Sequence, residues 1–203
     1  MLRLVVGLTA LLAAAPALAH HPMGGATPST LMEGLLSGFG HPVLGFDHFV
    51  FIIAAGLLAA PRARGLILLA AFVIGSFAGS LLHIQAVDLP GGEYLIAGSV
   101  LLMGALLLSR GEIGDGLFAG VLALAGLLHG HALAEAIIGA EPTPLVAYLG
   151  GLALTQYVIA AAAALAWRFL ATRHAASTPQ LRRVAGACAV AVGAFFLVAN
   201  IAG

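Results

Sequence analysis

The sequence predicts an all-α membrane protein, a bundle of six transmembrane helices that follows a cleaved signal peptide. Of the 203 residues, 62% are hydrophobic and only 8% are charged, whereas a soluble domain carries about 25% charged residues. Apolar runs near the ~20 residues needed to cross a bilayer recur along the chain. Because a backbone in lipid must satisfy its own hydrogen bonds, these runs are expected to be helices.

The first apolar run, within residues 1–19, has the pattern of a signal peptide. Arg3 supplies the positive start, LVVGLTALLAAA the apolar centre, and Ala17-Leu18-Ala19 the small-residue cleavage pattern. We expect cleavage after Ala19, so that the mature chain begins with His20 and His21. The alternative is that the segment remains as an uncleaved first span.

The mature chain is predicted to have two parts. Residues 20–42 form a periplasmic N-terminal segment, rich in Gly, Pro, Ser and Thr and then weakly amphipathic, which favours an outer loop or a short interfacial helix. Residues 43–203 form the transmembrane domain. Its six predicted spans are residues 43–60, 65–84, 94–109, 115–138, 144–170 and 184–202.

The charges between the spans predict the orientation in the membrane. Loops 61–64 and 168–183 are rich in arginine, whereas the alternate loops hold only Asp88, Glu93 and Glu141. Basic loops remain on the cytoplasmic side, so we expect a multi-pass protein of the bacterial inner membrane with both ends of the mature chain in the periplasm. The formal net charge of zero argues against a nucleic-acid partner.

Glycines recur at helical spacing within the predicted spans. The motif Gly-x-x-x-Gly occurs at 75–79, 116–120 and 126–130. Such motifs let the backbones of two membrane helices approach closely, and we interpret them as packing faces.

The eight histidines are the anomaly, because they equal the Lys and Arg residues in number. Seven of the eight fall on the predicted periplasmic side or in the outer half of the membrane. Imidazole suits nickel, copper, zinc and cobalt, and carboxylates offset the charge of the ion. An ionisable group at membrane depth marks a site or a pathway by default. The candidate metal ligands are His41, Asp47, His48, His83, His129, His131 and Glu135.

Some of these histidines have an equally good structural interpretation. His83 alone could simply hydrogen-bond within the protein. His20 and His21, beside the free α-amine, could collect metal or form a disordered tail. These alternatives remain open at the sequence level.

Spacing predicts which candidates share a face. His41 and His48 are seven residues apart, which places them on one side of a single helix, with His41 at its N-cap. His131 and Glu135 are related by i, i+4. His129 is two residues from His131, so it faces a different neighbour unless Gly130 distorts the helix.

The strings HPVLGFDH at 41–48 and HGHALAE at 129–135, with the signal peptide and the six spans, resemble the HupE/UreJ family of bacterial nickel/cobalt permeases. The resemblance implies metal handling by His41, Asp47 and His48 in the first span and by His129, His131 and Glu135 in the fourth. It also implies metal supply to hydrogenase or urease, with nickel as the favoured cargo. A second likeness, to the His-x4-Asp-His signature of the larger nickel/cobalt transporter family, is looser, because five residues separate His41 from Asp47.

The expected function is therefore uptake of Ni²⁺, and of Co²⁺ as a second cargo, by a permease that lies in the lipid bilayer. We expect no enzyme activity and no resident cofactor, and no P-loop string occurs. Homo-oligomerisation is left open. The alternative is an intramembrane zinc hydrolase with Asp47 or Glu135 as general base, and a metal sensor or store ranks last.

Overall fold

The structure is a computed structural model that describes residues 26–109, 111 and 113–202. The predicted signal peptide and the two histidines His20 and His21 lie outside the described residues, and the predictions made for them stand as predictions.

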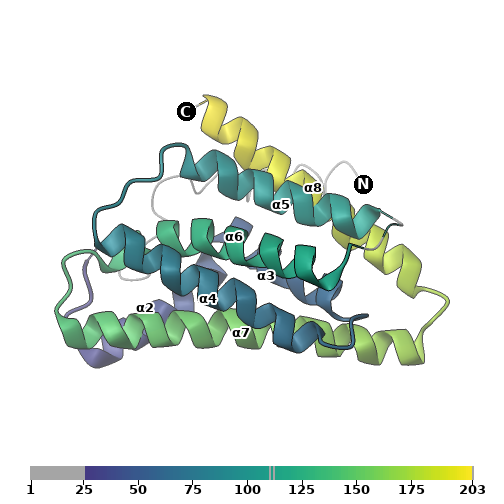
Figure 1. Ribbon diagram of the computed structural model, residues 1–203, viewed down its shortest axis with the longest axis horizontal. Helices are drawn as coiled ribbons and strands as arrows, with labels where there is room; N and C mark the ends of the chain where they lie inside the picture. Colours follow the sequence, from purple (N-terminus) through teal and green to yellow (C-terminus); the bar gives the residue numbers. More distant parts are fainter. Residues whose placement is uncertain (1–25, 110, 112, 203) are drawn as a thin grey trace, which may run out of the picture.

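The described residues fold into helices, with no strand among them, which confirms the all-α class. In Figure 1, α5 and α8 lie side by side, while α7 runs beneath α4 with α2 against its first part. The elements are α2 (Leu31–Leu44), α3 (Phe46–Ala59), α4 (Gly65–Ile84), α5 (Gly92–Leu108), α6 (Asp115–Leu133), the 3₁₀ helix η1 (Ala134–Ile137), α7 (Pro142–Arg173) and α8 (Thr178–Ala202).

Four of these elements are long and apolar enough to cross a membrane: α4, α6 together with η1, α7 and α8. The pair α2 and α3 passes the same test as one span, although it is bent by 78°. Helix α5, with 17 residues, is shorter. The described part of the chain thus has the helices of a multi-pass membrane protein, with four to five candidate spans, and the count of six remains a prediction.

The prediction of one helix carrying both His41 and His48 is wrong, because the chain breaks between them. Helix α2 continues to Leu44 with Pro42 inside it, and α3 begins at Phe46. Proline lacks the backbone N–H that would bond the preceding turn, and Gly45 leaves the helical region with ψ 98°. His41 and His48 therefore belong to different helices, and the spacing rule does not apply to them.

Two of the three glycine motifs bring α4 and α6 into close contact. The 75–79 motif of α4 faces the 126–130 motif of α6. A Cβ atom at Gly79 or at Gly130 would lie 1.9 Å from a backbone oxygen of the other helix. The 116–120 motif has nothing within 4 Å of its glycines and is not a packing face between the described helices. This contact sets the positions of the histidines that flank Gly130.

Helix α2 is held at its start and along one face. Thr30 and Glu33 form a capping box, in which each side chain accepts a hydrogen bond from the other residue's backbone N–H. Gly34 and Gly38 then pack directly against the backbone of α7. This packing directs His41, one turn further along, toward α7.

The predicted cytoplasmic loops meet at one end of the bundle. Arg168 of α7 donates hydrogen bonds to the backbone oxygens of Ala60 and Arg62, at 2.8 and 3.0 Å. Arg62 pairs with Asp115 at the start of α6, and Arg182 of α8 donates to Leu106 O of α5 at 3.2 Å. The separation of basic from acidic loops seen in the sequence is thus a separation in space.

Candidate metal-binding site

The structure joins two of the predicted ligands in the interior of the bundle. His48, in the first turn of α3, and His129, in the last two turns of α6, place their Nδ1 atoms 2.6 Å apart. The two residues are 4% and 0% exposed. Asp47 is 3% exposed; its Oδ1 accepts the backbone N–H of His48 at 2.9 Å and lies 4.0 Å from His48 Nε2. We call these three residues the inner site.

The ring of His129 is enclosed on its remaining sides. Its centroid lies 4.5 Å from that of Phe51 and 5.8 Å from that of Phe72. Its Nε2 lies 2.9 Å from Ser99 Oγ on α5. Sequence reasoning did not select Ser99. The one feature that could have indicated Ser99 is its polarity within an apolar run. Serines that only pack against another helix show the same feature.

A second pair lies nearer the end of the bundle. His83, at the end of α4, places its Nδ1 3.2 Å from both ring nitrogens of His131. His131 Nε2 lies 2.8 Å from Val87 O, and Glu135 and Asp88 are close enough to act electrostatically on His83. His83 is half-buried and His131 is 8% exposed. We call His83 and His131 the outer pair.

Glu135 does not continue the α-helix that carries His131, although both residues act electrostatically on His83. Helix α6 ends at Leu133, and Glu135 is an exposed residue of the 3₁₀ helix that follows. The tighter winding of a 3₁₀ helix changes the angle between residues four apart.

His41 contacts a tyrosine of α7. Its Nδ1 lies 2.9 Å from the hydroxyl of Tyr148 on α7, and that hydroxyl also donates to Leu133 O. Tyr148 is fully buried and was not selected from the sequence. It connects α2, α7 and the end of α6.

The predicted ligands therefore form separate groups rather than one cluster. Because His129 and His131 are two residues apart on a regular helix, they point about 200° apart around α6. One faces α3 and α5, and the other faces α4. Within the described ranges, no three His, Cys, Asp or Glu side chains are grouped so as to hold one ion.

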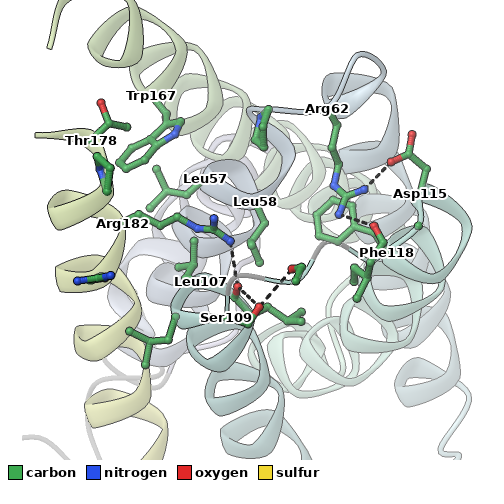
Figure 2. Close-up of a pocket in the computed structure, with 18 of the residues that line it drawn as sticks. Leu57, Leu58, Arg62, Leu107, Ser109, Asp115, Phe118, Trp167, Thr178 and Arg182 are labelled. Carbon is green, nitrogen blue, oxygen red and sulfur yellow. Dashed lines mark hydrogen bonds and ion pairs between the residues drawn. The ribbon is translucent and has the colours of Figure 1, made fainter. Parts of the chain in front are cut away.

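A cavity of about 740 Å³ lies at the opposite, basic end of the bundle (Figure 2). Arg62 extends across it to Asp115, with an Nη1 to Oδ1 distance of 2.5 Å, and its guanidinium lies 4.3 Å from the centroid of Phe118. Trp167 and Arg182 line the other side. None of the predicted metal ligands lines this cavity.

The comparison with known families covers both histidine motifs. The model of the family described as "HupE / UreJ protein" matches residues 8–196. The chain belongs to the HupE/UreJ family. Among curated proteins, "Protein HupE" of Rhizobium leguminosarum bv. viciae is 32% identical over 120 residues. That match covers 58% of this chain and 60% of the relative's length. No solved structure matches the chain.

Membership in the HupE/UreJ family agrees with the resemblance carried by HPVLGFDH and HGHALAE. Both strings lie inside the matched residues 8–196. The inner site takes Asp47 and His48 from the first string and His129 from the second. The outer pair takes His131 from the second string. The two strings that carry the resemblance thus supply the buried histidines and the buried aspartate of both sites.

Proposed function

We propose that this HupE/UreJ chain is an inner-membrane permease that takes up Ni²⁺, with Co²⁺ as a second cargo. The observation that carries the proposal is the inner site. Two imidazoles and a carboxylate, each 4% exposed or less, lie between helices that are otherwise apolar. Buried ionisable groups are costly in a membrane, and their presence by default indicates a pathway or site.

The outer pair has the geometry of a capture point. Bonds from zinc to imidazole nitrogen are about 2.0–2.1 Å, so two nitrogens on one such ion lie about 3 Å apart at a right angle. The Nδ1 atoms of His83 and His131 are 3.2 Å apart. Glu135 and Asp88 supply negative charge beside them. A hydrated divalent cation that arrives at this end meets nitrogen ligands and carboxylates together.

The inner site offers a nitrogen and an oxygen deeper in the bundle. His48 Nε2 and Asp47 Oδ1 are 4.0 Å apart, and an ion with bonds of about 2.0–2.2 Å to each fits between them. The carboxylate offsets part of the ion's charge, without which the desolvation cost of entering the interior is prohibitive. A small number of protein ligands keeps binding weak enough for release.

The membrane potential supplies a driving force for inward movement. With the histidine end in the periplasm and the arginine-rich end in the cytoplasm, two charges move down a potential of 100 mV with a gain of about 4.6 kcal/mol. The cargo then serves maturation of a metalloenzyme, hydrogenase or urease, as the family resemblance implies.

The zinc hydrolase is less well supported by the same geometry. A catalytic zinc takes three protein ligands and leaves a fourth position for water. The described residues do not group three such ligands around one point. Transport through sites of two ligands each needs no such group.

Uptake of radioactive nickel tests the proposal. Cells that express the chain should accumulate more ⁶³Ni than cells with an empty vector, and unlabelled Co²⁺ should compete. His48→Ala and His131→Ala should each abolish the difference at equal protein level. His174→Ala is the matched control, because His174 is exposed at the basic end and its variant should transport normally. Wild-type uptake no greater than the vector's would overturn the proposal.

A further inference from the structure

The inner histidines are too close together to hold an ion between them. Their Nδ1 atoms are 2.6 Å apart. Two bonds of about 2.0–2.1 Å to one ion require about 2.9 Å or more between the nitrogens, even at a right angle. The contact is a short hydrogen bond, in which one nitrogen carries a proton and the other a lone pair.

The hydrogens of the neighbouring groups determine which nitrogen carries the proton. Ser99 has one hydroxyl hydrogen, and it donates this hydrogen to Ile96 O at 2.7 Å. Ser99 Oγ is therefore the acceptor in its 2.9 Å contact with His129, so that His129 Nε2 carries a hydrogen. A neutral His129 then has its lone pair on Nδ1, and His48 Nδ1–H is the donor to it.

The surroundings of His129 leave no approach for an ion. Both of its ring nitrogens are occupied, one by Ser99 and the other by His48. The rings of Phe51 and Phe72 lie against it, and it is 0% exposed. His48 differs, because its Nε2 lies 4.0 Å from the carboxylate of Asp47.

We propose that His129 is a positioning residue and not a metal ligand, that Ser99 fixes its tautomer, and that His48 Nε2 with Asp47 binds the ion. The inference rests on the proposed function and assigns the roles within its inner site. A hydrogen bond donated by the second nitrogen of a metal-binding imidazole orients the ring and raises its basicity. Here another imidazole accepts that hydrogen bond.

The outer pair shows the contrast on the same helix. His131 Nε2 lies 2.8 Å from Val87 O, which only accepts, so His131 Nε2 carries a hydrogen and its Nδ1 keeps a lone pair. His83 Nδ1 is 3.2 Å from both ring nitrogens of His131, far enough from His131 Nδ1 for the two Nδ1 atoms to be ligands of one ion. The two histidines of the HGH string therefore have different roles, one as ligand and one as positioning residue.

Amide substitutions distinguish the two roles. The oxygen of Asn lies near the position of Nδ1 in His and can accept from His48, but a neutral amide is a poor ligand for nickel. His129→Leu should raise the KM for nickel about 10–100-fold, the usual effect of losing such a partner. His129→Asn should restore most of the loss, whereas His48→Asn should abolish uptake. Equal loss in His129→Asn and His129→Leu would overturn the proposal.

The tautomers can be measured without transport. In the purified, metal-free chain labelled with ¹⁵N-histidine, the NMR correlations of ring nitrogens with carbon-bound ring protons should show His129 with its hydrogen on Nε2 and His48 with its hydrogen on Nδ1. Ser99→Ala should reduce the Nε2–H form of His129, and Ser99→Thr should restore it. The opposite tautomers in the wild-type chain would overturn the proposal. Absence of nickel uptake by the wild-type chain would instead overturn the proposed permease function, and it would not affect the tautomers measured by NMR.

Discussion

At the scale of single residues, the inner site depends on a glycine that carries no chemistry. Gly45 lies at the break between α2 and α3, and a Cβ placed there would lie 2.5 Å from Cδ2 of the His48 ring. Its φ of −74° is accessible to any residue, so the requirement is for space beside the ring. Gly45 thus leaves room for the ring orientation in which His48 contacts His129 and lies near Asp47.

Gly45→Ala should therefore impair the site without removing a polar group. The added methyl group displaces the His48 ring, so we expect the KM for nickel to rise about 10–100-fold, as when a metal-binding histidine loses its orienting partner. Gly98→Ala is the matched control, because Gly98 adjoins Ser99 and has nothing within 4 Å of an added Cβ. Kinetics of ⁶³Ni uptake measure both variants, and a normal KM in Gly45→Ala would show that the ring orientation is not required.

The motifs identified the polar residues of the site but not their partners. His48, His129 and Asp47 were predicted from HPVLGFDH and HGHALAE, and the structure places them together. Ser99 and Tyr148 were not predicted, because each reaches a histidine from another helix. Spacing along one chain reports which residues share a face of one helix, and it carries no information on which helix packs opposite.

At the scale of elements, the site depends on a broken helix and on a close helix pair. The break at Gly45 places Asp47 and His48 in the first turn of α3, inside the bundle. The sequence indicated a continuous helix that begins near Pro42, because proline suits the first helical turn. By contrast, the Gly-x-x-x-Gly spacing predicted that α4 and α6 each have a packing face. The sequence did not indicate that these two faces pack against each other.

Gly130→Ala should weaken this helix pair measurably. The added methyl group would lie 1.9 Å from Ser76 O, so the helices must separate, at a cost of about 1–3 kcal/mol for overpacking. Thermal unfolding in detergent should show a lower midpoint, and nickel uptake should fall with it because His129 and His131 flank the position.

Gly120→Ala is the control on the same helix. It has nothing within 4 Å of an added Cβ, and alanine favours a helix over glycine by about 1 kcal/mol. An unchanged or higher midpoint is expected for this variant. A drop in Gly120→Ala equal to that in Gly130→Ala would show that glycine content, rather than contact with α4, determines stability.

At the scale of the whole molecule, the two ends of the bundle differ in chemistry. The arginine-rich loops meet at one end, where Arg62 and Asp115 join the end of α3 to the start of α6. The outer pair lies toward the other end, beside Asp88 and Glu135. The same two helices, α3 and α6, carry the inner site between these ends. This polarity was predictable from sequence, because loop composition alternates along the chain and helices connect one end to the other.

Cysteine labelling from outside the cell tests the direction in which this polarity lies. Starting from Cys188→Ala, Asp88→Cys introduces a thiol at the end with the outer pair and Ala175→Cys one in the turn between α7 and α8; both positions are exposed. If basic loops remain in the cytoplasm, a maleimide that does not cross the inner membrane should label Asp88→Cys in spheroplasts. It should label Ala175→Cys only after permeabilisation. The reverse pattern would place the arginines outside, and the membrane potential would then oppose movement of a cation from the outer pair toward the basic end.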